Sequence, residues 1–549
     1  MSDQAGPRVD AVIVGAGFAG LYALYRFRRL GLAARVFEAG DGIGGVWFWN
    51  RYPGARCDVE SMQYSYSFSE ELQQEWDWSE RFAPQPEILD YINHVADRFD
   101  LRRDIQFETR VTTAAFDEAE ARWTVETDRG DRVAARFCIM ATGCLSSARV
   151  PDLPGLADFA GDCFHTGAWP RTPVDFAGRQ VALIGTGSSG IQATPVIAEQ
   201  AAQLYVFQRT PNFVVPARNR ALDPETKQYW KGDYAAHRRR AREVGTFYEF
   251  SDRRAMDVSK EERRREYARR WQEGGVNFVH SFKDIYLDQD ANDTAAEFVR
   301  ERIRGLVADP AIADALSPTD HPLGAKRICV GGDYYETFNR PSVTLVNLRA
   351  EPIEAVTPAG IRTGSQEYAV DTLVLATGYD AMTGALLAID IRGRGGQSLR
   401  DKWACGPVNY LGLMTAGFPN LFTVTGPGSP SVLVNMVIGI EQHIDWIADC
   451  IGHLDTCGAA TIEALAEAEE SWVAHVNAEA GLTLFPQAAS WYMGANIPGK
   501  PRVFMPYVGG IGRYRRRCDE VAARGYEGFE IAGKAARPVQ PLSEPPSTT

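Results

Sequence analysis

The sequence of 549 residues lacks several features that would place it in a specialised class of proteins. None of its nine cysteines forms a CxxC pair, so neither a zinc site nor a disulfide framework is indicated. No apolar run approaches the roughly 18 residues that are needed to span a bilayer, and the opening stretch MSDQAGPRVD has no apolar core of a signal peptide. A net charge of −13 argues against general binding to nucleic acid or to anionic membranes. We therefore expect a cytoplasmic protein with reduced cysteines and no metal site. We also expect a monomer, although none of these features determines the oligomeric state.

The sequence does contain two glycine-rich turns, each placed between a predicted strand and a predicted helix. The first turn follows an apolar strand at residues 11–14 and precedes a helical pattern at 21–30, and the second follows a strand at 180–184. The glycines are Gly15, Gly17 and Gly20 in the first turn and Gly185, Gly187 and Gly190 in the second. Glycines at such a turn let the backbone approach a pyrophosphate, whose charge is favoured at the helix N-terminus. The sequence therefore predicts an α/β fold with two Rossmann-like dinucleotide-binding domains.

The residue that follows the second strand of each unit indicates which nucleotide is preferred. The strand at 34–37 ends at Glu38, and the strand at 204–207 is followed by Arg209. A carboxylate accepts hydrogen bonds from free ribose hydroxyls and repels a 2′-phosphate, so the first unit fits FAD or NAD. A guanidinium suits a 2′-phosphate, so the second unit fits NADP(H). One charge-assisted hydrogen bond contributes roughly 1.5–3 kcal/mol, so Arg209 alone could set this preference.

The order of these elements predicts a first domain that is built from both ends of the chain. A strand followed by Ala-Thr-Gly occurs at 138–143 and again at 372–378, and the second copy is expected to return the chain to the first domain. The expected parts are an FAD-binding domain at 1–145 and 385–535, an NADP-binding domain at 146–220 and 325–384, a helical insertion at 221–324, and a disordered tail at 536–549 rich in proline and serine. The charge runs at 238–240 and 261–265 are interpreted as solvated helix faces.

Three further motifs connect these units. The stretch FxGxxxHxxxWP lies at residues 159–170, between the two nucleotide signatures. Gly44-Gly-Val-Trp47 leads through Tyr52-Pro-Gly54 to Asp58, and ATGYD lies at 376–380. The chain resembles a type I Baeyer–Villiger monooxygenase in all three motifs and over nearly its whole length. Its segments 51–61, 426–436 and 490–500 are similar to the phenylacetone and steroid monooxygenase branch.

This resemblance implies a reaction in which the flavin performs the difficult chemistry. NADPH would reduce FAD, the reduced flavin would capture O2 as a C4a-peroxide, and the peroxide would attack a hydrophobic ketone. The tetrahedral (Criegee) adduct would rearrange to an ester or lactone. Arg327 matches the arginine that serves the peroxide anion and then the adduct oxyanion. Asp58 matches the carboxylate that pairs with this arginine, and one opposite charge about 4 Å away contributes roughly 4 kcal/mol at an effective dielectric of 20.

The resemblance also assigns residues to the two cofactors, the pocket and a hinge. FAD would be held by Gly15, Gly17, Phe18, Gly20, Glu38, Val46, Trp47, Asp58, Tyr64, Val111 and Met436. NADP would lie on Gly185, Thr186, Gly187, Ser188, Ser189, Gly190, Gln192, Arg209, Thr210, Lys326 and Trp491. The pocket would be shaped by Ser431, Val432, Leu433 and Met436, and the hinge would contain His165 and Trp169.

Parts of the sequence are also compatible with three other functions. A flavin-containing N/S-oxygenase is the nearest alternative, but Trp169-Pro170 and Arg327 argue against it as the main activity. A disulfide reductase needs a redox pair of cysteines near the flavin, and Cys57 has no such neighbour in the sequence. A non-catalytic NADPH-responsive protein would not require Asp58, Arg327 and both glycine turns together. His165 could act as a general base, but a place at the hinge is the favoured interpretation, because a peroxide anion needs a cation nearby.

Overall fold

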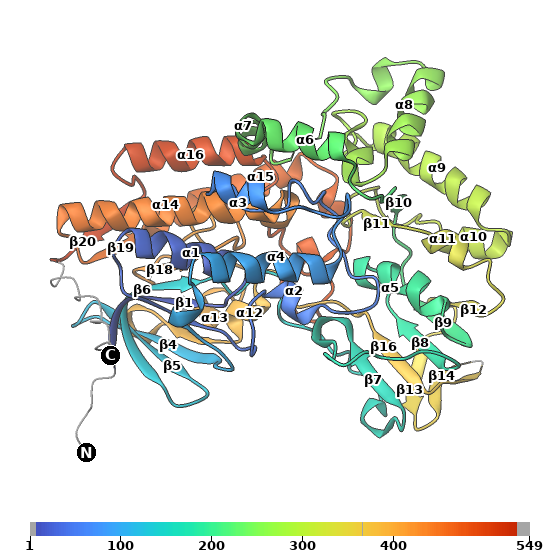
Figure 1. Cartoon of the computed structure of the whole chain (residues 1–549), viewed down its shortest axis with the longest axis horizontal. Coiled ribbons are helices and arrows are strands. Elements are labelled where there is room, and N and C mark those ends of the chain that lie inside the picture. The colour runs from blue at the N-terminus through green and yellow to red at the C-terminus, as the bar shows by residue number, and fades with distance from the viewer. Residues whose placement is uncertain (1–6, 247, 365, 535–549) are drawn as a thin grey trace.

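A computed structural model describes residues 7–246, 248–364 and 366–534, and helices pack against its two largest sheets, which are separate from each other (Figure 1). The predicted disordered tail lies outside these residues. The first sheet has the strand order β17-β4-β5-β6-β1-β2-β3, with β18 also paired to β6. Its strands are β1 (Arg8–Val14), β2 (Ala34–Phe37), β3 (Ile105–Gln106), β4 (Val111–Asp117), β5 (Arg122–Thr127), β6 (Arg132–Met140), β17 (Asp390–Arg392) and β18 (Leu421–Thr423). Because β17 and β18 pair with strands from the first third of the chain, distant parts of the sequence build one sheet.

The second sheet is parallel throughout, in the order β12-β9-β8-β16-β7. Its strands are β7 (Asp162–His165), β8 (Gln180–Ile184), β9 (Gln203–Gln208), β12 (Val343–Asn347) and β16 (Thr372–Leu375). The antiparallel sheet of β13 (Ile353–Thr357), β14 (Gly360–Thr363) and β15 (Glu367–Ala369) lies beyond it. Each glycine turn joins a central parallel strand to a helix, α1 (Phe18–Arg29) in the first unit and α5 (Ser188–Ala198) in the second. The predicted α/β fold with two Rossmann-like units is confirmed.

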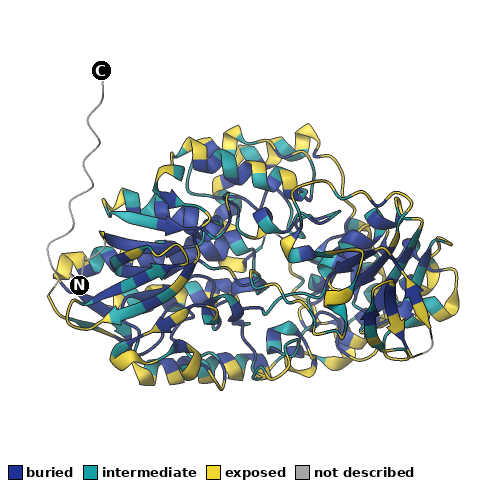
Figure 2. Ribbon diagram, turned by 90° about the horizontal axis from the view of Figure 1, so that it is seen from below, coloured by how far each residue is buried: buried dark blue, intermediate teal, exposed yellow. Residues whose placement is uncertain are grey.

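The strands of both sheets are largely buried, and the helices around them have exposed outer faces (Figure 2). One face of the second sheet packs against residues of β13, β14 and β15. On the first sheet, α1 packs against α14 (Met436–Cys457). The other helices outside the insertion are α2 (Val46–Trp49), α3 (Glu70–Glu75), α4 (Gln85–Arg98), α11 (Tyr334–Thr337), α12 (Gly384–Leu387), α13 (Leu399–Lys402), α15 (Ala466–Gly481) and α16 (Ile511–Ala523). The pair β19 (Thr461–Ala464) and β20 (Phe529–Ala532) lies at the end of α14. All nine cysteines are free, and none of the described helices combines the length and the apolar character needed to cross a membrane.

The helical insertion is divided between the two sheets. It leaves and re-enters through the paired strands β10 (Val214–Pro216) and β11 (Cys329–Gly331). Its helices are α6 (Pro224–Gly232), α7 (Tyr234–Val244), α8 (Lys260–Glu273), α9 (Gln289–Leu306) and α10 (Pro310–Leu316). Trp230 and Tyr234 are buried in the core that contains α1 and α14, whereas Trp271 and Phe298 are buried in the core of the second sheet. The insertion therefore connects both nucleotide-binding units.

The interpretation of residues 238–240 as a solvated face is wrong for Arg238. Its side chain is buried, with a residue exposure of 5%, and it donates hydrogen bonds to the Gln63 carbonyl at 3.0 Å and to the Ser65 hydroxyl at 2.7 Å. The guanidinium also lies over the Tyr234 ring at 5.5 Å. Burial of the positively charged Arg238 guanidinium is tolerated because its N–H groups form hydrogen bonds where α7 packs against the core of the first sheet.

His443 on α14 gives the fold a dependence on pH. Its Nδ1 accepts the Thr425 N–H at 2.9 Å, so its Nε2 carries the proton and faces the Tyr514 hydroxyl at 3.0 Å. Burial lowers the pKa of His443 to about 3, below its ordinary value of 6.5. The unfolded chain therefore binds the proton more readily, and stability is lost as pH falls from about 6.5 towards 3.

We expect protonation of this histidine to lower the free energy of unfolding by about 2 kcal/mol between pH 7 and pH 5. Urea denaturation of the FAD-loaded protein at both pH values measures this difference. The His443→Gln variant is the control, because glutamine can still accept the Thr425 N–H but does not titrate. An equally large pH effect in that variant would contradict the assignment.

Candidate functional site

The first glycine turn leaves no space for side chains. Gly15 has φ +104°, and a Cβ there would lie 2.7 Å from the Ala141 carbonyl oxygen. A Cβ on Gly20 would lie 1.8 Å from the Gly15 carbonyl oxygen, so α1 packs directly on the turn. Gly17 caps α1, and a Cβ on Gly45 would lie 3.0 Å from the Gly17 Cα. Because no side chains cover the backbone at the N-terminus of α1, its N–H groups can approach a phosphate, and the turn fits the pyrophosphate of FAD.

Glu38 is positioned beside this turn by backbone hydrogen bonds. Its carboxylate accepts the Ala16 N–H at 2.7 Å and the Gly40 N–H at 2.8 Å. Burial raises the pKa of Glu38, and the backbone hydrogen bonds oppose that rise. The carboxylate is thus held at the end of β2, where a ribose is expected.

The other predicted FAD residues fall into two groups. Phe18, Trp47 and Tyr64 lie together: the Trp47 Nε1 donates to the Tyr64 hydroxyl at 3.1 Å, and the Phe18 and Tyr64 ring centroids are 5.4 Å apart. Val46 is exposed at the start of α2, Val111 packs in a separate apolar cluster with β1 and β2, and Met436 begins α14. The structure therefore brings the aromatic residues together and leaves Val111 apart from them.

The second glycine turn repeats the geometry of the first. Gly185 has φ +115°, and a Cβ there would lie 2.3 Å from the Ala376 carbonyl oxygen. A Cβ on Gly190 would lie 2.1 Å from the Gly185 carbonyl oxygen. Gly187 caps α5, whose first residues are Ser188 and Ser189. The Thr186 hydroxyl donates to the Thr210 carbonyl at 2.8 Å and ties the turn to the residue after Arg209. This turn also fits a pyrophosphate.

Cationic side chains gather at the edge of the second sheet where β9 ends. Arg209 follows β9, and Arg349 follows the neighbouring β12, whose Asn347 is in register with Gln208. Burial lowers the pKa of Lys326, Asp320 raises it, and Arg209 and Arg349 lower it further. Three cations and one carboxylate therefore share this edge, and an added anion would relieve the repulsion. The arrangement fits the 2′-phosphate of NADP, and Arg349 is a member that the sequence did not reveal.

Arg327 and Asp58 form a bidentate ion pair. The Arg327 Nε and Nη2 donate to the two Asp58 carboxylate oxygens, each at 2.9 Å, and Nη1 donates to the Val432 carbonyl at 2.9 Å. The side chains are 30% and 19% exposed. Burial alone would lower the pKa of Arg327, but Asp58 and Tyr492 more than offset it, so the pKa is raised. The guanidinium is fixed in position and stays charged.

The predicted pocket residues lie next to this pair. Val432, Leu433, Met436 and Trp491 share one apolar cluster, which also contains Tyr492. Ser431 has φ +41°, and its hydroxyl donates to the Thr425 carbonyl at 2.8 Å, which shapes the loop. Tyr492 is close enough to Arg327 to help raise the pKa of the guanidinium, and burial raises the pKa of the Tyr492 phenol. The only sequence signal for Tyr492 was its position beside Trp491.

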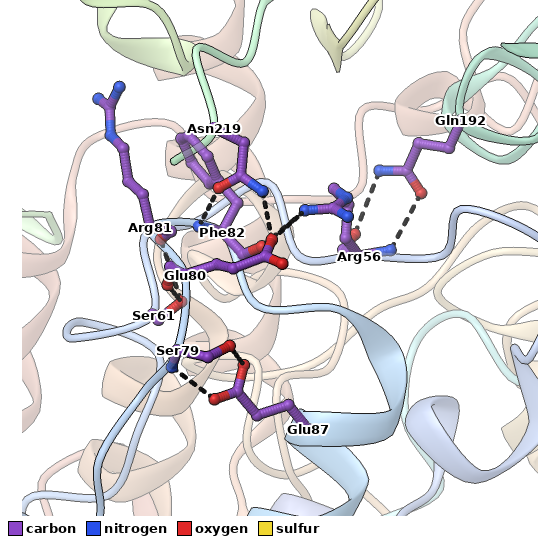
Figure 3. A network of polar contacts seen from close by, with 9 residues as sticks. All are labelled: Arg56, Ser61, Ser79, Glu80, Arg81, Phe82, Glu87, Gln192 and Asn219. Atoms are coloured by element: carbon purple, nitrogen blue, oxygen red, sulfur yellow. Dashed lines mark hydrogen bonds and ion pairs between the residues drawn. The ribbon is translucent and has the colours of Figure 1, made fainter. Parts of the chain in front are cut away.

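Gln192 of α5 connects the second nucleotide turn to the segment that carries Asp58 (Figure 3). Its side-chain oxygen accepts the Tyr52 hydroxyl at 2.8 Å and the Arg56 N–H at 3.4 Å, and its amide donates to the Arg56 carbonyl at 3.1 Å. The Arg56 guanidinium in turn pairs with Glu80 at 3.0 Å. The side-chain amide of Gln192, which was predicted to contact NADP, therefore forms its hydrogen bonds with Tyr52 and Arg56 of the first unit.

The chain passes between the two units twice, once near Arg149 and once near Thr377, and His165 contacts both of these crossing segments. Its Nδ1 accepts the Gly167 N–H at 3.0 Å, so Nε2 carries the proton and donates to the Arg149 carbonyl at 3.2 Å. The Thr377 hydroxyl lies 3.3 Å from the same Nε2. Burial lowers the pKa of His165. Trp169 is buried, with its ring centroid 5.3 Å from that of Phe164. His165 and Trp169 therefore lie between the two units. Both ring nitrogens of His165 are engaged in hydrogen bonds to the backbone.

Comparison with known proteins identifies the family. Residues 8–224 match the FMO-like family of flavin-binding monooxygenase-like proteins. A Baeyer–Villiger monooxygenase of Pseudooceanicola batsensis is 43% identical over 95% of this chain and 96% of its own. A phenazine N-monooxygenase of Lysobacter antibioticus is 41% identical over 96% of this chain and 98% of its own. A solved structure of an oxidised steroid monooxygenase bound to NADP is 55% identical with a TM-score of 0.92, covering 96% of this chain and 99% of the other. The chain belongs to the Baeyer–Villiger monooxygenases and is an FAD- and NADP(H)-dependent enzyme.

Proposed function

We propose that this enzyme converts neutral, hydrophobic ketones to esters or lactones at the Arg327–Asp58 pair, with O2 and NADPH as co-substrates. The observation that carries the proposal is a fixed, charged guanidinium bordered by the apolar cluster of Val432, Leu433 and Met436. FAD, once reduced by NADPH, supplies the activation of O2 and the transfer of one oxygen atom. The apolar side chains suit the hydrocarbon part of the substrate and exclude water.

Arg327 would stabilise negative charge as it develops on the reacting oxygen atoms. Its three donors are oriented by Asp58 and by the Val432 carbonyl, so no reorganisation is required during the reaction. Asp58 would keep the guanidinium in this orientation. Tyr492 would limit the movement of Arg327 from the side of the loop that also holds Trp491.

We assign FAD to the first glycine turn, Glu38 and the Phe18–Trp47–Tyr64 cluster, and NADP(H) to the second turn and the cations around Arg209. The division of the chain at 1–145, 146–220, 221–324, 325–384 and 385–535 is part of the same proposal, supported by the pairing of β17 and β18 with the first sheet. We further propose a monomer, because one chain contributes every element of the site. Nine free cysteines fit a cytoplasmic location.

N-oxygenation is the second candidate, because a phenazine N-monooxygenase is similar over the whole chain. An equimolar mixture of phenylacetone and an aryl methyl sulfide or tertiary amine, supplied with NADPH, separates the two functions. Mass spectrometry is expected to show the ester as the main product, with sulfoxide as a minor one. Oxidation of only the heteroatom compounds would refute the ketone proposal.

The His165→Ala variant tests the hinge. Because His165 holds the two crossings of the chain together, its loss is expected to leave flavin reduction by NADPH within twofold of wild type and to release more hydrogen peroxide per NADPH consumed. Stopped-flow absorbance and a peroxidase assay measure the two quantities. Unchanged values for both would exclude a coupling role.

A further inference from the structure

The end of α10 lies beside the ends of β9 and β12, where the cations of the second unit gather (Figure 1). The Gln208 side-chain amide, in the last residue of β9, donates to the Ala315 carbonyl of α10 at 2.7 Å. The Gln208 carbonyl accepts the Leu348 N–H at 2.8 Å, which fixes the end of β12 beside the end of β9. Three segments that are distant in the sequence therefore meet directly before Arg209 and Arg349.

Asp320, in the loop between α10 and β11, binds Arg349 directly. One oxygen of its carboxylate forms an ion pair with Nη2 of the guanidinium, and the two side chains are 32% and 48% exposed. An arginine has five N–H donors, so donors remain that can bind an anion. The stem of an arginine side chain has many rotamers, so an ion pair at its head decides where these donors lie.

His321 holds the other oxygen of the same carboxylate. Its Nδ1 lies 2.6 Å from the Asp320 Oδ1, and its side chain is 1% exposed. Burial alone would raise the pKa of Asp320, but His321 and Arg349 more than offset it, so the pKa is lowered. Burial lowers the pKa of His321. Because an ionised carboxylate only accepts hydrogen bonds, the neutral ring carries its proton on Nδ1 and donates it to Asp320.

Helix α9 anchors the backbone on both sides of Asp320. The Arg300 Nε donates to the Pro318 carbonyl at 2.7 Å. The fully buried Asn292 accepts the Leu323 N–H at 2.8 Å, and its amide donates to the Leu323 carbonyl at 2.9 Å. The carboxylate of Asp320 is thus presented by a loop that is fixed before and after it.

The charge of Asp320 has two opposite effects on an anion at this edge. It lies near enough to Lys326 to interact with it electrostatically, so it would repel a bound phosphate. By fixing Arg349 it would also strengthen the binding of that phosphate. Since both of its oxygens are already engaged, by His321 and by Arg349, its charge is largely compensated and the positioning effect is the larger one.

We propose that Asp320 is a positioning residue for the 2′-phosphate of NADP(H), which holds Arg349 beside Arg209 so that both guanidiniums can bind the phosphate. His321 keeps the carboxylate in place. The inference rests on the assignment of NADP(H) to this edge of the second sheet in the proposed function. It extends the recognition of the 2′-phosphate to the loop between α10 and β11.

Asp320→Asn tests this role without catalytic turnover. Isothermal titration calorimetry of the FAD-loaded protein measures the affinity for adenosine 2′,5′-bisphosphate, and 5′-AMP is the reference ligand without a 2′-phosphate. The variant is expected to bind the bisphosphate about three- to tenfold more weakly, a part of the roughly 10- to 150-fold that one charge-assisted hydrogen bond contributes. Its affinity for AMP should stay within about twofold. Unchanged or tighter binding of the bisphosphate would overturn the inference.

A double-mutant cycle shows whether Asp320 acts through Arg349. Arg349→Ala alone is expected to weaken binding of the bisphosphate at least about tenfold. Adding Asp320→Asn to that variant should cause no further loss, because no guanidinium remains to be positioned. If Asp320→Asn weakens binding as much in the Arg349→Ala background as in the wild type, the proposed route through Arg349 is wrong.

Asp162→Asn is the matched control. Asp162 begins β7 of the same sheet and pairs with Arg179 at 2.5 Å. Arg179 directly precedes β8, so this pair lies at the opposite strand ends from the glycine turn. The substitution likewise removes a carboxylate from an arginine, and it should leave the affinity for both ligands as in the wild type.

These measurements also separate the inference from the proposed function. A wild-type protein that binds the bisphosphate and AMP equally well would refute the assignment of the phosphate site, and this inference with it. A wild type that distinguishes the two ligands, with an Asp320→Asn variant that does so equally well, would refute the inference alone. Conversion of ketone to ester is measured separately and enters neither result.

Discussion

Replacing Arg327 by alanine is expected to reduce ester formation from a ketone by at least about 10²–10³-fold, the usual effect of removing a preorganised donor from a site of developing negative charge. Flavin reduction by NADPH should change far less, because the nucleotide sites remain intact. Steady-state product formation and stopped-flow flavin reduction measure the two steps. The variant should retain its FAD, since Arg327 contacts Asp58, Val432 and Tyr492 rather than the first glycine turn.

Two controls make this result specific. Arg327→Lys keeps the positive charge but loses the bidentate contact to Asp58, so an intermediate activity is expected. Arg239→Ala, at an exposed position on α7, removes a charge without touching the site and should resemble the wild type. An Arg327→Ala enzyme with more than a tenth of the wild-type rate of ester formation would contradict the assignment.

Removing the cations at the end of β9 is expected to abolish the preference for NADPH. Each charge-assisted hydrogen bond to the 2′-phosphate contributes roughly 1.5–3 kcal/mol, so Arg209→Ala should weaken NADPH binding about 10- to 150-fold. Lys326→Ala should also weaken NADPH binding. The loss of affinity should be limited, because Arg349 remains. Flavin reduction measured against NADPH concentration gives the apparent dissociation constants.

NADH provides the internal control for these variants, because it lacks the 2′-phosphate. Its kinetics should be unchanged or improved when the cations are removed. An equal loss with NADH and NADPH would show that the substitutions damage the turn itself, and the assignment of the phosphate site would then be wrong.

Local features of the sequence predicted the nucleotide-binding units well. The predicted strands at 34–37 and 180–184 have the bounds of β2 and β8. The glycines were informative because close packing and positive φ at Gly15 and Gly185 are requirements of the turn alone. The helix after the first turn was expected to begin at residue 21, but it begins at Phe18. The difference arises because the helix starts directly after its N-cap, Gly17, and the apolar pattern that marks a helix in the sequence becomes recognisable only a few residues later.

Features that depend on packing between distant segments were less accessible. Arg327 and Asp58 were paired by resemblance to a family, since no spacing in the sequence connects them. Arg238 was misjudged because its burial depends on carbonyl and hydroxyl groups of residues 63 and 65. Arg349 is brought beside the proposed phosphate site by the register of β12 on β9, which cannot be read from either strand alone.

The most direct test of the account uses isotopically labelled oxygen. The FAD-loaded enzyme is incubated with NADPH, phenylacetone and ¹⁸O2, and the product is analysed by mass spectrometry. We predict an ester that carries one ¹⁸O atom in its bridging position and an unlabelled carbonyl oxygen, in proportion to the NADPH consumed. Consumption of NADPH with recovery of unchanged ketone and labelled hydrogen peroxide, for every ketone tested, would contradict the claim that the Arg327–Asp58 pair serves ketone oxygenation.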